Sequence, residues 1–193
     1  MAWSAIGKVR QRLDANVFKT LRLGRRYWDA ELSNISDDKN YKGRIFVYDQ
    51  NLLDNIHKGI GLVLLGDYRT GKTSIGSWLL KRVYEEGGTS LFVRYDEITS
   101  SVLEKTGFSD RETLYQRMVG VDLLMIDDVG TGNMNDLVKG MFEMVCRKRY
   151  DNSKSTILTT NYPEKAFSQI VGAGLYKMLR STCDFIICDG EWK

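Results

Sequence analysis

Short, uninterrupted apolar runs recur along the chain and alternate with longer stretches in which apolar residues are spaced three and four apart. The apolar runs occupy residues 60–65, 90–95, 121–126, 155–160 and 184–188. Runs of this length between turn-forming residues are typical of strands buried on both faces. Helical spacing is found at residues 73–86, 97–105, 110–119, 134–149 and between 164 and 180. The alternation predicts βαβ units and an α/β fold, with a parallel sheet covered by helices on both faces.

The N-terminal part of the chain follows a different pattern. Residues 6–21 place apolar side chains at spacings of three and four, with Lys and Arg between them, which predicts an amphipathic basic helix. Residues 32–43 are polar and rich in turn formers, as in a linker, and a short helix is expected around 48–57. We therefore expect a basic helix and linker at 1–43 and a globular domain at 44–193.

Charge is distributed unevenly along the chain. Its formal net charge is +3, yet residues 1–30 hold seven Lys and Arg against two Asp, a net +5, which leaves −2 for the remainder. Any contact with a polyanion is therefore expected to begin at the N-terminus. For the basic helix, three interpretations stay open: packing on the chain's own core, docking on a partner protein, or binding along a nucleic-acid backbone.

Composition narrows the class of protein. Hydrophobic residues make up 42% and charged residues 27% of 193, as in globular domains. No apolar run approaches the roughly 20 residues of a membrane span, and no signal peptide is evident, so we expect a cytoplasmic protein without a membrane partner. The three cysteines include no C-x-x-C pair, which argues against a disulfide framework and a zinc ribbon.

The first apolar run leads directly into Gly66-Asp-Tyr-Arg-Thr-Gly-Lys-Thr73, which matches the pattern G-x-x-x-x-G-K-[ST]. Its glycines let successive backbone N–H groups converge on a phosphate at the positive end of the following helix. Lys72 is expected to contact the β- and γ-phosphates, and the Thr73 hydroxyl to join the shell of a Mg²⁺ ion. The expected nucleotide-binding residues are Gly66, Asp67, Tyr68, Arg69, Thr70, Gly71, Lys72, Thr73 and Ser74.

Polar residues also end two later apolar runs. Asp127 and Asp128 follow the run at 121–126, and Asn161 follows the run at 155–160. Taken alone, these would be a solvated strand end and a turn. Ligands of open α/β sheets, however, bind at the carboxyl ends of the strands, where the phosphate loop also lies. We therefore expect Asp127 to hold Mg²⁺, Asp128 to orient or deprotonate the attacking water, and Asn161 to hold the γ-phosphate or the water.

These motifs together resemble the DnaC/IstB-like branch of the AAA+ ATPases, which contains helicase loaders and transposition ATPases. The resemblance extends from about residue 25 to residue 191 and rests on the phosphate loop, the double acid followed by Val129-Gly130, and the Thr-Thr-Asn triplet at 159–161. It implies the P-loop NTPase fold of the AAA+ (ASCE) class. This fold is a three-layer sandwich with strand order 5-1-4-3-2, here without a C-terminal helical lid domain.

The resemblance also implies a function. It implies an ATP- and Mg²⁺-dependent protein of DNA metabolism that forms ATP-dependent homo-oligomers. Most often, such a protein places a replicative helicase on single-stranded DNA.

One departure from the family concerns an arginine that reaches the γ-phosphate of a neighbouring subunit. Read without gaps from Asn161, two such positions fall on Gly174 and Met178, and only Arg180 remains. Either Arg180 takes the role, or hydrolysis is slow or depends on a cation from a partner. The alternative for Arg180 is a structural role at a helix C-terminus, and the basic cluster that ends the stretch 141–150 receives the same structural interpretation.

The leading hypothesis is therefore an ATPase that serves as a DnaC-like helicase loader. An IstB-like transposition ATPase and a nucleotide switch or structural subunit without hydrolysis remain as alternatives. A small-molecule phosphotransferase is disfavoured by the acid pair and the Thr-Thr-Asn triplet.

Overall fold

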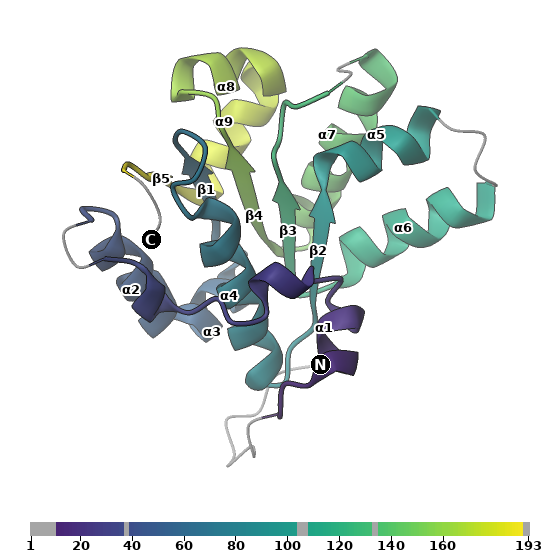
Figure 1. The fold of residues 1–193 in the computed structure, drawn as a ribbon. Coiled ribbons are helices and arrows are strands. Elements are labelled where there is room, and N and C mark those ends of the chain that lie inside the picture. Colours follow the sequence, from purple (N-terminus) through teal and green to yellow (C-terminus); the bar gives the residue numbers. More distant parts are fainter. Residues whose placement is uncertain (1–10, 37–38, 104–107, 133–134, 191–193) are drawn as a thin grey trace.

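The computed structural model describes residues 11–36, 39–103, 108–132 and 135–190. Within these ranges, five parallel strands form one sheet in the order β2-β3-β4-β1-β5 (Figure 1), the expected order read from the opposite edge. The strands are β1 (Gly61–Leu65), β2 (Ser90–Arg94), β3 (Leu123–Asp127), β4 (Ser155–Thr160) and β5 (Cys183–Ile187).

Helices cover both faces of this sheet (Figure 1). The α-helices are α1 (Ala15–Thr20), α2 (Lys42–Gln50), α3 (Leu52–Lys58), α4 (Lys72–Glu85), α5 (Tyr95–Leu103), α6 (Phe108–Gly120), α7 (Asp136–Asp151), α8 (Glu164–Val171) and α9 (Ala173–Thr182). Two 3₁₀ turns, η1 (Arg25–Tyr27) and η2 (Leu32–Asn34), lie between α1 and α2. In the described ranges, which end at residue 190, no helix follows β5, and none is both long and apolar enough to pass through a bilayer.

The core is divided by the sheet into two clusters. Successive side chains of a strand point to opposite faces. In β1, Leu62 and Leu64 therefore pack with α4 and the N-terminal residues, whereas Val63 and Leu65 pack with α5, α7 and α9. Every residue of β1 is buried, which explains why its sequence is a continuous apolar run rather than an alternating one.

The N-terminal helix is shorter than predicted. Instead of the expected helix over 6–21, α1 begins at Ala15, and residues 1–10 lie outside the described residues. The carboxylate of Asp14 caps this helix by accepting hydrogen bonds from the backbone N–H groups of Asn16 (2.8 Å) and Val17 (2.9 Å). Val17 is buried in the core beside α4, so the described part of this segment packs on the chain's own core.

The segment predicted as a linker, 32–43, also contributes to this core. It contains η2 and the start of α2, and its Ile35 and Tyr41 are buried. Residues on both sides of position 43 thus share one core. The single helix predicted around 48–57 is in fact two helices, α2 and α3, which meet at Asn51.

Candidate functional site

The loop between β1 and α4 is shaped by residues with unusual backbone angles. Gly66 has φ of 142°, and any Cβ there would collide with the carbonyl oxygen of Cys188. Gly71, with φ of 85°, precedes the first turn of α4. Arg69 also takes a positive φ, 63°, which is uncommon for a residue with a side chain. The loop therefore turns sharply and delivers its last residues to the N-terminus of α4, where backbone N–H groups have no partner within the helix.

The ammonium group of Lys72 lies inside this loop. Its Nζ donates hydrogen bonds to the carbonyl oxygens of Gly66 (2.8 Å) and Asp67 (2.7 Å) and to the hydroxyl of Thr70 (3.2 Å). Burial lowers the pKa of Lys72, while the nearby acids oppose that shift. The hydroxyl of Tyr41 donates to the carbonyl oxygen of Thr70 (2.9 Å), so the buried start of α2 holds the loop from outside.

Asp127, the last residue of β3, is bound by hydroxyl groups from two other elements. The Thr73 hydroxyl lies 3.0 and 3.2 Å from its two carboxylate oxygens, and the Thr159 hydroxyl donates to one of them at 2.6 Å. Burial raises the pKa of Asp127 to about 6, although the hydrogen bonds from Thr159 and Thr73 oppose that shift. A hydroxyl and a carboxylate this close are the kind of oxygen ligands that Mg²⁺ prefers.

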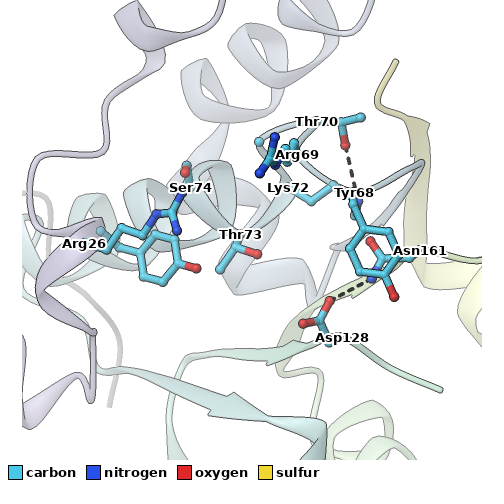
Figure 2. Close-up of a pocket in the computed structure, with 11 residues that line it drawn as sticks. Arg26, Tyr68, Arg69, Thr70, Lys72, Thr73, Ser74, Asp128 and Asn161 are labelled. Carbon is cyan, nitrogen blue, oxygen red and sulfur yellow. Dashed lines mark hydrogen bonds between the residues drawn. The ribbon is translucent and has the colours of Figure 1, made fainter. Parts of the chain in front are cut away.

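Thr159 on β4 and Asn161, which directly follows that strand, position the second acid. The same Thr159 hydroxyl accepts a hydrogen bond from the backbone N–H of Asp128 (2.9 Å), and it thereby connects both acids to β4. Asn161 donates from Nδ2 to the Asp128 carboxylate at 3.1 Å (Figure 2). Asp128 itself has φ of 57°, which turns the chain out of the strand direction directly after β3.

These groups surround one cavity of about 510 Å³ (Figure 2). It is lined by Arg26, Tyr27, Tyr68, Arg69, Thr70, Gly71, Lys72, Thr73, Ser74, Asp128 and Asn161. Of the expected site residues, Gly66, Asp67 and Asp127 lie next to this lining, because they bind Lys72 and Thr73. Arg26 and Tyr27 were not among the expected site residues, and they precede the phosphate loop by some 40 residues.

Arg180 lies away from this cavity. Its guanidinium is 3.3 Å from the carboxylate of Glu164 and 4.7 Å from the centre of the Phe185 ring, and half of its side chain is exposed. Gly174, on the same helix α9, faces Arg147 of α7. Arg180 thus has no contact with the cavity of its own chain, and a role at the site of a neighbouring subunit stays a prediction.

Comparisons with known proteins identify the family of the chain. A family model described as IstB-like ATP binding protein matches residues 34–184. Among curated protein sequences, no significant match was found.

Solved structures share the fold. The crystal structure of the DnaC helicase loader has a TM-score of 0.72 at 23% identity, covering 86% of this chain and 100% of that one. The crystal structure of DnaI has a TM-score of 0.77 at 17% identity, covering 86% and 95%. AMPPCP-bound DnaA from Aquifex aeolicus has a TM-score of 0.71 at 16% identity, covering 83% of this chain and 50% of that one. The family match spans most of the chain, so the protein belongs to the IstB-like ATP-binding family, and its fold is that of AAA+ P-loop domains.

Proposed function

We propose that this member of the IstB-like ATP-binding family binds ATP with Mg²⁺ and hydrolyses it, and that the bound nucleotide controls an assembly that acts on DNA. One observation carries the proposal. The phosphate loop and the Asp128–Asn161 pair line one cavity of about 510 Å³, and Asp127 lies directly beside it, within hydrogen-bonding distance of Thr73.

Binding would begin at the N-terminus of α4. The unpartnered N–H groups there attract the phosphates, and Lys72 adds a full positive charge. Lys72 now donates to carbonyl oxygens of its own loop, which are weaker acceptors than a phosphate, so it can exchange them for phosphate oxygens. The hydrogen bond from Tyr41 to the loop restrains the backbone of the loop from outside during this exchange.

The residues beside the loop fit a magnesium ion. Thr73 and Asp127 offer one hydroxyl and one carboxylate, and the described residues contain no cluster of three or more metal-binding side chains. Phosphate oxygens and water would complete the shell, as is usual for Mg²⁺ at nucleotide sites. Bound there, Mg²⁺ would neutralise charge on the phosphates and favour the ionised form of Asp127, which burial disfavours.

For hydrolysis, we assign to Asp128 the role of holding the attacking water. Asn161 fixes one oxygen of its carboxylate, and the other is left to accept a proton from the water. Lys72 stabilises charge that develops on the transferred phosphoryl group. Thr159 is hydrogen-bonded to both Asp127 and Asp128. It thereby keeps the proposed magnesium ligand aligned with the residue that holds the attacking water.

The test is phosphate release by the purified protein, with ATP, Mg²⁺ and single-stranded DNA. Asp128→Asn is expected to lower turnover by about one-hundredfold or more while it retains ATP affinity, because it removes the base and preserves the side-chain shape. Asp54→Asn, a change in an exposed ion pair on α3, is the matched control and is expected to turn over normally. Wild-type turnover by Asp128→Asn would contradict the role of Asp128. Tight ATP binding by the wild-type chain without any turnover would favour the nucleotide switch.

As the biological role, we propose loading of a replicative helicase onto single-stranded DNA by an ATP-dependent oligomer. The likeness to the DnaC helicase loader and DnaI supports this role, whereas the family description supports the alternative, a transposition ATPase. The discriminating measurement is DNA unwinding by a purified replicative helicase. Stimulation of unwinding that requires both this protein and ATP supports the loader. ATP-dependent stimulation of a transposase, without an effect on unwinding, supports the alternative.

A further inference from the structure

Two residues in the wall of the cavity come from outside every nucleotide-binding motif. Arg26 and Tyr27 belong to η1, which lies between α1 and α2 and reaches the cavity beside Thr73 and Ser74. The Arg26 side chain is exposed, and in the ranges that the structure describes it joins no ion pair. Its neighbour Arg25 has a different surrounding, because its guanidinium lies over the ring of Trp28 at 6.0 Å. Only one of the two adjacent arginines therefore faces the site.

This turn is fixed against the phosphate-loop helix. Lys81, a buried residue of α4, donates from Nζ to the carbonyl oxygens of Trp28 and Ala30, both at 2.6 Å. The indole N–H of Trp28 donates to the carbonyl oxygen of Leu23 at 3.0 Å, and its ring stacks on Phe18. Because α4 begins with Lys72 and Thr73, the same helix positions both the phosphate loop and η1.

The surroundings of Tyr27 show how close η1 comes to the acids. Burial raises the pKa of Tyr27, and the charge of Asp127 raises it further, whereas the charge of Arg26 and the hydroxyl of Thr73 lower it. In Figure 2, Arg26 lies near Ser74, at the end of the cavity away from Asn161 and Tyr68. A cation there would add a second positive charge to that of Lys72, whose ammonium lies within the phosphate loop in the wall of the cavity.

We propose that Arg26 binds the phosphate chain of the nucleotide, on the side that faces Thr73 and Ser74, and thereby makes the N-terminal segment part of the site. The inference rests on the proposed function, since it requires that a polyphosphate occupies the cavity. A guanidinium suits this role because its planar N–H groups can bind two phosphate oxygens at once and stay charged at any physiological pH. The contact is made within one chain and needs no neighbouring subunit.

The test compares Arg26→Ala with Arg25→Ala in a binding titration, with ATP·Mg²⁺ and with inorganic tripolyphosphate as separate ligands. For Arg26→Ala, affinity is expected to fall about ten- to one-hundredfold for both ligands, the value of one charged hydrogen-bonding contact. Arg25→Ala is the matched control and is expected to stay within about twofold of wild type, because Arg25 does not line the cavity. Arg26→Lys is expected to recover part of the lost affinity, since lysine keeps the positive charge but lacks the planar guanidinium group.

Two results would overturn the inference. Equal affinities for Arg26→Ala and Arg25→Ala would show that Arg26 makes no contact. A loss with ATP but not with tripolyphosphate would place the contact on the nucleoside instead of the phosphates. Lys72→Ala separates this inference from the proposed function: if it binds ATP like the wild type, or if the wild-type chain binds none, the proposed function itself fails. A loss in Lys72→Ala without a loss in Arg26→Ala would reject only the role of Arg26.

Discussion

Two of the buried cations in the described part of the chain, Lys72 and Arg149, lie at opposite ends of one sheet and differ in what surrounds them. Lys72 lies at the carboxyl ends of the strands, in the wall of a cavity, and binds acceptors of its own loop. Arg149, on α7, lies at the amino ends of β3 and β4 and has an exposed fraction of 0%. Burial lowers the pKa of both groups, that of Arg149 to about 9.

Arg149 is enclosed by acceptors on every side. Its five hydrogen bonds go to the Thr156 hydroxyl and to the carbonyl oxygens of Met118, Val121, Asp122 and Ser155. An arginine has five N–H donors, so none is left over. These acceptors belong to the end of α6, the turn before β3, and the start of β4. Arg149 therefore joins three segments in a purely structural role.

The comparison teaches that burial of a charge does not by itself identify a binding site. Burying a cation is costly, and both residues offset the cost with hydrogen bonds. The difference is that the acceptors of Lys72 border a cavity and can be exchanged for a ligand, whereas those of Arg149 enclose it completely. The predictions below test this distinction, from the largest expected effect to the smallest.

Arg149→Met is expected to lower the free energy of unfolding by about 3–5 kcal/mol, because four buried or half-buried carbonyl oxygens lose the hydrogen bonds that Arg149 donates to them. ATP affinity of the folded variant should remain near the wild-type value. Urea denaturation and a binding titration measure the two quantities. Should this variant not fold, Arg149→Lys keeps the charge with fewer donors and should show a smaller loss of stability. A loss below about 1 kcal/mol in Arg149→Met would refute the structural role.

Lys72→Ala is expected to show the opposite profile. ATP affinity should fall by more than about one-hundredfold, because a charged contact to two phosphates is removed, while the free energy of unfolding changes by about 1 kcal/mol or less. The same denaturation and titration experiments apply. If stability and ATP affinity fell together, the two buried cations would not differ as proposed.

Thr159→Val tests whether the alignment of the acids matters for the chemistry rather than for binding. It removes the hydroxyl between Asp127 and Asp128, so turnover is expected to fall about tenfold, with ATP affinity within about threefold of wild type. Phosphate release under saturating ATP measures turnover. Thr159→Ser keeps the hydroxyl and should restore most of the rate. Equal rates for the Val and Ser variants would exclude this alignment role.

Lys81→Met tests a third buried cation. Lys81 holds the residues next to η1 in place, and through them it is expected to affect nucleotide binding at the site. Loss of its bonds to Trp28 and Ala30 should loosen η1 and lower ATP affinity by about three- to tenfold. In a chain that already carries Arg26→Ala, the same substitution should cost no further affinity, because the group that Lys81 positions is gone. Additive losses in a double-mutant cycle would mean that Lys81 acts by another route.

Much of the fold could be predicted from the sequence, since each buried strand is a short apolar run. The run at 155–160 coincides with β4, while β3 begins two residues later than the predicted 121–126. There, Asp122 leaves the strand because its carboxylate accepts hydrogen bonds from Thr89. At the N-terminus the helical spacing of apolar residues begins at residue 6, before the start of α1 at Ala15. Asp14, which caps this start, was the local signal that could have corrected the prediction.

The residues of the site also fall into those that the sequence could predict and those that it could not. Lys72, Thr73, Asp128 and Asn161 could be placed together because strand ends and a loop motif identify them. Arg26 could not, because its position depends on how η1 packs on α4, and that packing is set by Lys81 and Trp28 rather than by a local pattern. The buried state of Arg149 was hidden for a similar reason: among other basic residues, nothing in the sequence distinguishes it from a solvated helix end.

The N-terminal residues also protect the two outermost strands. The carbonyl oxygen of Leu21 accepts a hydrogen bond from the backbone N–H of Phe92 in β2 (2.9 Å), and Arg44 donates from Nη1 to the carbonyl oxygen of Phe185 in β5 (2.9 Å). Strands at the margin of a sheet otherwise present free backbone groups that recruit another chain and lead to aggregation. The first part of the chain thus satisfies one backbone group at each margin, which helps to prevent aggregation through the edges of the sheet.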